Sequence, residues 1–177
     1  MEEKIIDTRA IYAGRVVRLD VHQVELPNGV QGRREILTHP GAVAIVALDD
    51  EQHVLLVRQF RLAANQVMLE IPAGTREPGE DIFVCAEREL REETGQRPLK
   101  LEHLGGFFVA PGYTTEYIHL FLAEGYEPAP LTMDADEQIS VERVPLREAL
   151  AMIDDGRIID GKSAVGLLRV ARRLSLV

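Results

Sequence analysis

Three glutamate side chains are spaced so that they could act together on one face of a helix. Glu89, Glu92 and Glu93 lie at positions i, i+3 and i+4, and residues with this spacing are neighbours on a helix surface. Like charges placed in this way repel one another and destabilise the helix. A bound divalent cation would remove the repulsion, because Mg²⁺ and Mn²⁺ prefer oxygen ligands. The alternative is a solvated acidic face, since most charge runs are found on the surface.

The residues around the three acids favour a built site over a solvated face. Arg88 places one positive charge among the acids. The turn before the helix contains residues that are used where backbone geometry is demanding: Gly74, Pro78 and Gly79. A separate apolar stripe predicts that the helix has a buried side: Phe83, Ala86 and Leu90. The sequence therefore predicts a turn and helix that are positioned by the rest of the fold.

The stretch from Gly74 to Gln96 resembles the signature of the Nudix hydrolases. In that signature a glycine is followed after five residues by a glutamate, and after seven more by Arg-Glu-apolar-x-Glu-Glu-x-Gly and an aliphatic residue. Eight positions are in register: Gly74, Glu80, Arg88, Glu89, Leu90, Glu92, Glu93 and Gly95. Gln96 replaces the aliphatic residue, a change that we expect to affect packing beyond the helix and not the chemistry. Eight residues at fixed spacing are a far more specific signal than a short glycine motif.

The resemblance implies metal-assisted hydrolysis of a diphosphate. In such sites, clustered carboxylates hold divalent ions that typically lie ~3.5–4 Å apart. The implied cofactor is Mg²⁺, with Mn²⁺ as the alternative. The implied metal ligands are the carbonyl of Ala73 and the side chains of Glu89, Glu92 and Glu93. Glu92 and Arg88 are also expected to take part in catalysis, and an ion pair between Glu80 and Arg88 is favoured over direct metal contact by Glu80.

An acidic segment at residues 134–137 offers a candidate general base. Related enzymes carry a catalytic or metal-binding glutamate in this part of the chain. Glu137 is the favoured base, Asp136 is the rival, and a solvated loop is the alternative. An acidic loop can also close over a bound substrate.

Residues outside the signature predict the substrate. The segment Val109–Glu116 resembles one that is characteristic of ADP-ribose pyrophosphatases, although Ala110 replaces the usual serine before Pro111. In the same subfamily, the arginine that ends a segment similar to Val57–Arg61 contacts the diphosphate. Arginine suits this bidentate role, and a surface charge at a strand end is the alternative reading of Arg61. The resemblance thus implies that Arg61, Pro111 and Glu116 contact substrate, with Glu116 at the distal ribose.

The resemblance also implies that two residues near the N-terminus recognise the base. In related enzymes such residues come from the other subunit of a dimer and hold the adenine. Here they are Arg34, which can stack on a base, and Glu35, which can accept a hydrogen bond from an exocyclic amine.

The resemblance implies an enzyme that hydrolyses ADP-ribose to AMP and ribose 5-phosphate. The nearest alternative is a pyrophosphatase for another nucleoside diphosphate sugar such as GDP-mannose. A rival of another class is a nucleotide-sugar sensor without catalytic activity. The intact set of Glu89, Glu92 and Glu93 argues against a sensor, because a sensor has no need to keep acids that repel one another.

Composition excludes several other classes of protein. The chain has 177 residues and a net charge of −9, which argues against a nucleic-acid-binding surface. No signal region or apolar run of ~20 residues predicts a membrane segment, so a cytoplasmic location is expected. The single cysteine, Cys85, is expected to be a core residue and not a nucleophile. The five histidines are scattered along the sequence without metal-ligand spacing.

Hydrophobic periodicity and turn residues predict an α/β fold with a small antiparallel annex. The annex, residues 1–39, should form three strands around a hairpin at Asn28-Gly29. Residues 40–177 should form the Nudix domain, an α/β/α sandwich with a mixed sheet. Expected strands are 42–48, 53–60, 99–108, 117–123 and 139–144, while residues 66–72 should lead into the motif turn and residues 124–138 should form a loop. One helix should follow the motif turn and end at Gly95, and two more should span 145–155 and 161–174. A three-stranded sheet is marginal alone, so a homodimer that shares or exchanges the annex strands is predicted.

Overall fold

The computed structural model describes residues 1–132 and 138–176. The chain divides into two compact units. The N-terminal unit contains Met1–Gly41 together with Phe107–Tyr117, and the second unit contains Ala42–Gly106 and Ile118–Val177. The first unit therefore combines two segments that are far apart in the sequence.

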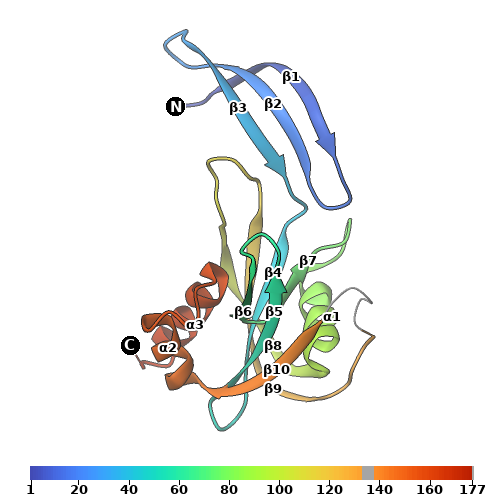
Figure 1. Cartoon of the computed structure of the whole chain (residues 1–177), viewed down its shortest axis with the longest axis vertical. Helices are drawn as coiled ribbons and strands as arrows, with labels where there is room; N and C mark the ends of the chain where they lie inside the picture. The colour runs from blue at the N-terminus through green and yellow to red at the C-terminus, as the bar shows by residue number, and fades with distance from the viewer. Residues whose placement is uncertain (133–137, 177) are drawn as a thin grey trace. The chain divides into compact units, whose positions relative to one another are not determined.

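The N-terminal unit is built on a three-stranded antiparallel sheet (Figure 1). Its strands, in the order β1-β2-β3, are Lys4–Ala13, Arg18–Glu25 and Gln31–Thr38. The predicted hairpin between β2 and β3 is confirmed, and Gly29 has a φ of 80°, a conformation that glycine adopts at little cost. The second segment is attached to β3 by backbone hydrogen bonds from Leu37 N to Tyr113 O (2.8 Å) and from Thr115 N to Leu37 O (3.0 Å).

The second unit is organised around a mixed sheet with the order β10-β5-β4-β9-β8. Its central strand β4, Ala42–Leu48, is buried throughout and runs parallel to β9. The short strands β6 and β7 pair with β5 and β4. The remaining bounds are β5 His53–Arg61, β6 Gln66–Glu70, β7 Ala73–Thr75, β8 Gln96–Phe108, β9 Tyr117–Pro128 and β10 Ile139–Pro145.

Helices cover both faces of this sheet (Figure 1). The helices are α1 Ile82–Thr94, α2 Leu146–Asp154 and α3 Gly161–Arg173. Val43, Ile45 and Ala47 of β4 pack in one buried cluster with residues of α1, including Leu90. Val46 instead contacts α3 at Gly166. Because alternate side chains of a strand point to opposite faces, the predicted α/β/α sandwich is confirmed.

Helix α1 begins and ends at capping residues encoded in the motif. Asp81 is the N-cap, and its side chain accepts hydrogen bonds from the backbone N–H groups of Phe83 and Val84. Gly95 ends the helix in the left-handed conformation, with a φ of 71°, as the sequence predicts. The buried side of α1 includes Cys85, Ala86 and Leu90.

Four details of the sequence prediction are wrong. Phe83 is 45% exposed and not buried, although its ring packs edge-on against Phe121. Strand β9 continues to Pro128 through residues that were expected to form a loop. Pro145 is the N-cap of α2 and not its first helical residue, and β7 inside the motif turn was not foreseen. None of the helices in the described part of the chain is long and apolar enough to cross a membrane.

Candidate active site

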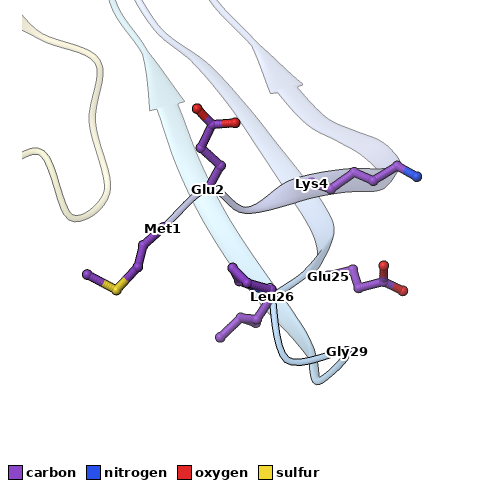
Figure 2. Close-up of a pocket in the computed structure, with 7 residues that line it drawn as sticks. Met1, Glu2, Lys4, Glu25, Leu26 and Gly29 are labelled. Carbon is purple, nitrogen blue, oxygen red and sulfur yellow. The ribbon is translucent and has the colours of Figure 1, made fainter.

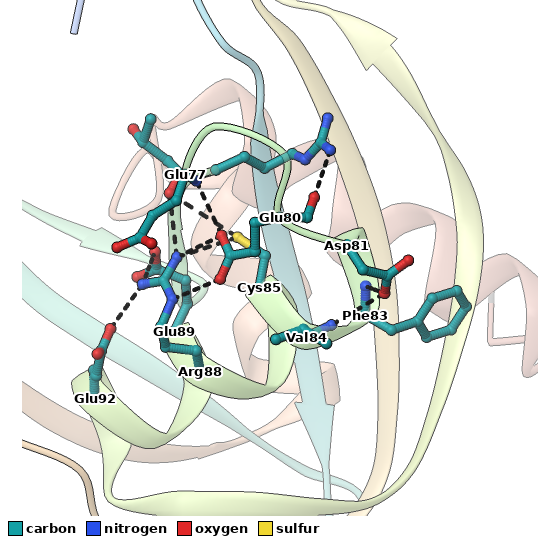
Figure 3. Close-up of polar contacts among 11 residues, drawn as sticks. Glu77, Glu80, Asp81, Phe83, Val84, Cys85, Arg88, Glu89 and Glu92 are labelled. Atoms are coloured by element: carbon teal, nitrogen blue, oxygen red, sulfur yellow. Dashed lines mark hydrogen bonds and ion pairs between the residues drawn. The ribbon is translucent and has the colours of Figure 1, made fainter.

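Arg88 lies at the centre of the carboxylates on α1 (Figure 3). Its Nε and Nη2 donate to the two carboxylate oxygens of Glu80 at 2.8 and 2.9 Å. Its Nη1 donates to Glu89 at 2.7 Å and to Glu92 at 2.9 Å. The predicted ion pair between Glu80 and Arg88 is therefore present, and it ties the motif turn to the helix. The same guanidinium offsets the repulsion between acids on this face.

The charges around Arg88 perturb the groups that contact it. The hydrogen bond from Arg88 lowers the pKa of Glu80 to about 2, although burial opposes the shift. Burial raises the pKa of the Cys85 thiol, and the nearby Glu80 raises it further. Cys85 is fully buried and stays a neutral thiol at physiological pH, in agreement with its predicted role as a core residue.

Glu93 and Gly74 bring the motif turn into close contact with α1. Glu93 is 5% exposed, and its Oε2 accepts a hydrogen bond from the backbone N–H of Ala73 at 3.0 Å. A Cβ atom on Gly74 would lie only 2.0–2.2 Å from the carboxylate atoms of Glu89. Strand β7 is held against β4 at this point, where Val43 pairs with Gly74. The fold thus gathers Ala73, Glu89 and Glu93 around the motif glycine.

This donor set suits a divalent cation. Carboxylate and carbonyl oxygens are the ligands that Mg²⁺ and Mn²⁺ prefer, and the absence of a side chain at Gly74 leaves room for the Glu89 carboxylate. Among the described residues, no three His, Cys, Asp or Glu side chains already converge on one point. Glu89 and Glu92 each place an oxygen on Arg88 instead. Glu137, predicted as the base, and its rival Asp136 lie outside the described residues.

Arg61 is anchored by a buried carboxylate that the sequence analysis missed. Its Nε and Nη2 donate to Oε1 and Oε2 of Glu70 at 2.9 and 2.8 Å, and Glu70 is only 1% exposed. The hydrogen bond to Glu70 raises the pKa of Arg61 most, and the charge of Glu93 raises it further. Arg61 is therefore within electrostatic range of the carboxylate site. The only sequence signal for this buried carboxylate is that Glu70 is a charged residue between the apolar residues Leu69 and Ile71.

The other predicted substrate residues lie in the N-terminal unit. Arg34 forms a two-bond ion pair with Glu3, and Glu35 pairs with Arg33 at 3.0 Å. Pro111 lies in a tight turn that is closed by hydrogen bonds from the N–H groups of residues 113 and 114 to the carbonyl of residue 110. Glu116 joins the two ends of the same segment, because its carbonyl accepts from the N–H of residue 109 at 3.1 Å.

Comparison with known proteins establishes the family. The NUDIX domain matches residues 38–163 of the chain, a range that contains every motif residue described above. The chain belongs to the Nudix family. It is 44% identical to a methanol dehydrogenase activator from Bacillus methanolicus and 41% identical to an ADP-ribose pyrophosphatase from Bacillus subtilis (strain 168). Each alignment covers 94% of this chain and 91% of the relative.

A solved structure agrees with the family assignment. A crystal structure of an ADP compounds hydrolase superposes on this Nudix protein with a TM-score of 0.89. The two sequences are 25% identical, and the match covers 99% of this chain and 95% of the other.

Two further features of this Nudix protein were not foreseen. His103 and His119, 16 residues apart, lie side by side on β8 and β9, with Nε2 and Nδ1 separated by 3.3 Å. A pocket in the N-terminal unit is lined by residues of the β2–β3 hairpin and of the chain start (Figure 2): Met1, Glu2, Lys4, Glu25, Leu26, Pro27 and Gly29. The pocket contains none of the predicted site residues.

Proposed function

We propose that this Nudix protein hydrolyses the diphosphate of ADP-ribose, giving AMP and ribose 5-phosphate, with Mg²⁺ as its cation. The observation that supports this most is that Arg61 is bound by Glu70, three residues before Ala73, whose N–H is in turn bound by Glu93 of α1. A cation site supplies one half of a diphosphate-binding surface, and an arginine fork supplies the other. The relative from Bacillus subtilis, which aligns with nearly the whole length of the chain, is named an ADP-ribose pyrophosphatase.

In the proposed reaction, water attacks one phosphorus atom and the anhydride P–O bond breaks. Ala73, Glu89, Glu92 and Glu93 would hold the cation, with Mn²⁺ as the alternative to Mg²⁺. Once bound, the cation supplies positive charge and Lewis acidity to the diphosphate. Arg61 would orient the diphosphate through its guanidinium, and Arg88 keeps the motif turn closed on α1. Glu137 is proposed to accept the proton of the attacking water, whose oxygen stays on the attacked phosphorus. The bridging oxygen leaves with the other phosphate.

The rest of the substrate would be recognised by four further residues. Arg34 and Glu35 of the partner subunit are proposed to hold the adenine, Pro111 to contact the substrate, and Glu116 to hydrogen-bond the distal ribose. Arg34 and Glu35 are already paired with Glu3 and Arg33, so adenine would have to exchange for these exposed partners. Exposed ion pairs are worth little, and the exchange is therefore inexpensive.

The proposal predicts turnover of ADP-ribose in the presence of Mg²⁺. Purified protein should release AMP and ribose 5-phosphate in equal amounts, and chelation of the divalent cation should abolish the activity. GDP-mannose, assayed in parallel with Mg²⁺ and Mn²⁺, should be a much poorer substrate. Cleavage of GDP-mannose without release of AMP from ADP-ribose would show that the substrate assignment is wrong.

A second candidate is a protein that acts on another enzyme. The relative from Bacillus methanolicus is named as an activator of methanol dehydrogenase, which favours this class. The nucleotide-sugar sensor predicted as an alternative belongs to this class, as a member without catalytic activity. Binding of ADP-ribose without hydrolysis under any cation would support it, and the glutamate substitution described in the Discussion separates the two candidates.

We also propose a homodimer formed through the N-terminal sheet. Strand β1 is exposed along its whole length, and it carries exposed apolar side chains at Ile5, Ile11 and Tyr12. A second copy would cover this surface. Light scattering at micromolar concentration should give twice the chain mass of 19.8 kDa, and a monomer mass would contradict the proposal.

A cytoplasmic location is also proposed, because the one cysteine is a buried free thiol.

A further inference from the structure

The carboxylate that holds Arg61 has a second cationic partner from the C-terminal helix. Glu70 is the last residue of β6 and is almost completely buried. Arg61 occupies both of its oxygens, and the ammonium of Lys162, at the start of α3, contacts Oε2 as well. The side chain of Lys162 is itself only 14% exposed. Two cations therefore share one buried carboxylate.

The start of α3 is fixed against β6 by further hydrogen bonds. Asp160, the N-cap of α3, lies 3.1 Å from the Lys162 ammonium. Its Oδ2 also accepts from the backbone N–H and hydroxyl groups of Ser163 at 2.9 and 2.5 Å. The Ser163 oxygen in turn accepts from the backbone N–H of Ile71 at 2.9 Å. These bonds fix the start of α3 beside β6, and the Lys162 ammonium lies between the carboxylates of Glu70 and Asp160.

The second cation helps to keep the buried Glu70 carboxylate ionised. Burial alone would raise the pKa of Glu70, but the hydrogen bond from Arg61 and the charge of Lys162 outweigh it and lower the pKa. Glu70 is therefore ionised at neutral pH. Lys162 also lies 3.1 Å from Asp160, so the four side chains Arg61, Lys162, Glu70 and Asp160 together carry no net charge. Within this group, the ammonium of Lys162 offsets part of the Glu70 charge that acts on Arg61, whose side chain is 37% exposed.

We propose that Lys162 is a positioning residue for diphosphate binding, which shares the Glu70 carboxylate and so fixes the carboxylate that orients Arg61. The inference rests on the proposed function. Arg61 contacts Glu70 through Nε and Nη2, and its Nη1 donates no hydrogen bond to a side chain of the described residues, which leaves it available for phosphate oxygens. Lys162 itself does not contact the substrate; it acts through Glu70 and Arg61.

The first test is a Lys162→Met variant. This change keeps much of the side-chain length but removes the charge, and it should raise KM for ADP-ribose about tenfold with a smaller effect on kcat, as expected for one lost charge contribution to binding. Lys162→Arg should restore KM to near the unmodified value. Lys100→Met is the matched control, because Lys100 also pairs with a glutamate, Glu124, but is exposed. It should leave KM unchanged.

The second test asks whether Lys162 acts through Arg61. In an Arg61→Met background, adding Lys162→Met should not raise KM further, because the guanidinium that Lys162 helps to position is already gone. If Lys162 only stabilised the fold, Lys162→Met would lower the melting temperature and the active fraction. Any increases in KM of the two single variants would then multiply in the double variant. Multiplicative effects, or an unchanged KM in Lys162→Met, would overturn the proposal. If Lys162→Met does not fold, Lys162→Gln takes its place, since it keeps a hydrogen bond to Glu70 without the charge.

Binding of ADP separates this proposal from the proposed function. Calorimetric titration of ADP with Mg²⁺ measures diphosphate affinity whether or not ADP-ribose is turned over. Lys162→Met should weaken ADP binding in the otherwise unmodified protein but not in the Arg61→Met background. This result would support the role of Lys162 even if the substrate assignment fails. Turnover of ADP-ribose together with unchanged ADP affinity in Lys162→Met would overturn the role of Lys162 alone.

Discussion

Glu93→Gln is expected to lower kcat for ADP-ribose by about a thousandfold while the protein stays folded. The side chain is 5% exposed and accepts from the Ala73 N–H, a bond that the amide oxygen of glutamine can also accept. The substitution keeps the shape but removes the charge that a divalent cation needs from its ligand. Removal of one preorganised electrostatic group at a reacting centre typically costs about 10²–10³ in kcat. The affinity for Mg²⁺ should fall in parallel, as measured by calorimetry.

The matched control for Glu93→Gln is Glu87→Gln. Glu87 is on the same helix, and its side chain is 43% exposed and paired with Arg91 at 3.4 Å. The same chemical change at this position should leave kcat and Mg²⁺ affinity unchanged. If Glu93→Gln kept kcat within tenfold of the unmodified protein, Glu93 would not be a metal ligand. An effect on a partner enzyme that survives in Glu93→Gln, after hydrolysis is lost, would favour the activator candidate.

Gly74→Ala should lower kcat about a hundredfold through its effect on one carboxylate. The new Cβ would lie 2.0–2.2 Å from the carboxylate atoms of Glu89, so that the carboxylate must move. The φ of Gly74 is not in the left-handed region, so alanine adds no backbone strain. Because the displaced atoms are the end of a flexible side chain, the melting temperature should change little. The loss should therefore appear in kcat and in Mg²⁺ affinity.

Gly161→Ala is the control for an added methyl group. Nothing lies within 4 Å of the Cβ position at Gly161, which is the first residue of α3. Alanine there should leave both activity and melting temperature near those of the unmodified protein. A Gly74→Ala variant with full activity would show that Glu89 can leave its present position without cost, and would remove it from the proposed metal ligands.

Features that depend on neighbouring residues were predicted from the sequence. The motif spacing placed the glutamates on one face of α1, and Gly95 ends the helix as predicted, because both follow from local backbone geometry. The apolar run Ala42–Leu48 is the buried central strand, since a strand covered on both faces has no polar positions. The pairing of Glu80 with Arg88 was also expected, because both belong to one short motif.

Contacts between distant segments could not be predicted in this way. Nothing local indicates that Phe107–Tyr117 belongs with the N-terminal sheet, since that grouping depends on hydrogen bonds to Leu37. The partial exposure of Phe83 depends on how α1 lies against the sheet.

The residues around Arg61 show most clearly which features the sequence determines and which depend on the tertiary structure. The sequence by itself determined the acids, the motif arginine and the turn that presents them, because their spacing lies within one helix and its preceding turn. Only the tertiary structure decided that Arg61 shares Glu70 with Lys162, a residue 92 positions from Glu70. A buried carboxylate must find cations wherever the fold supplies them, and the sequence does not say which distant helix will begin beside it.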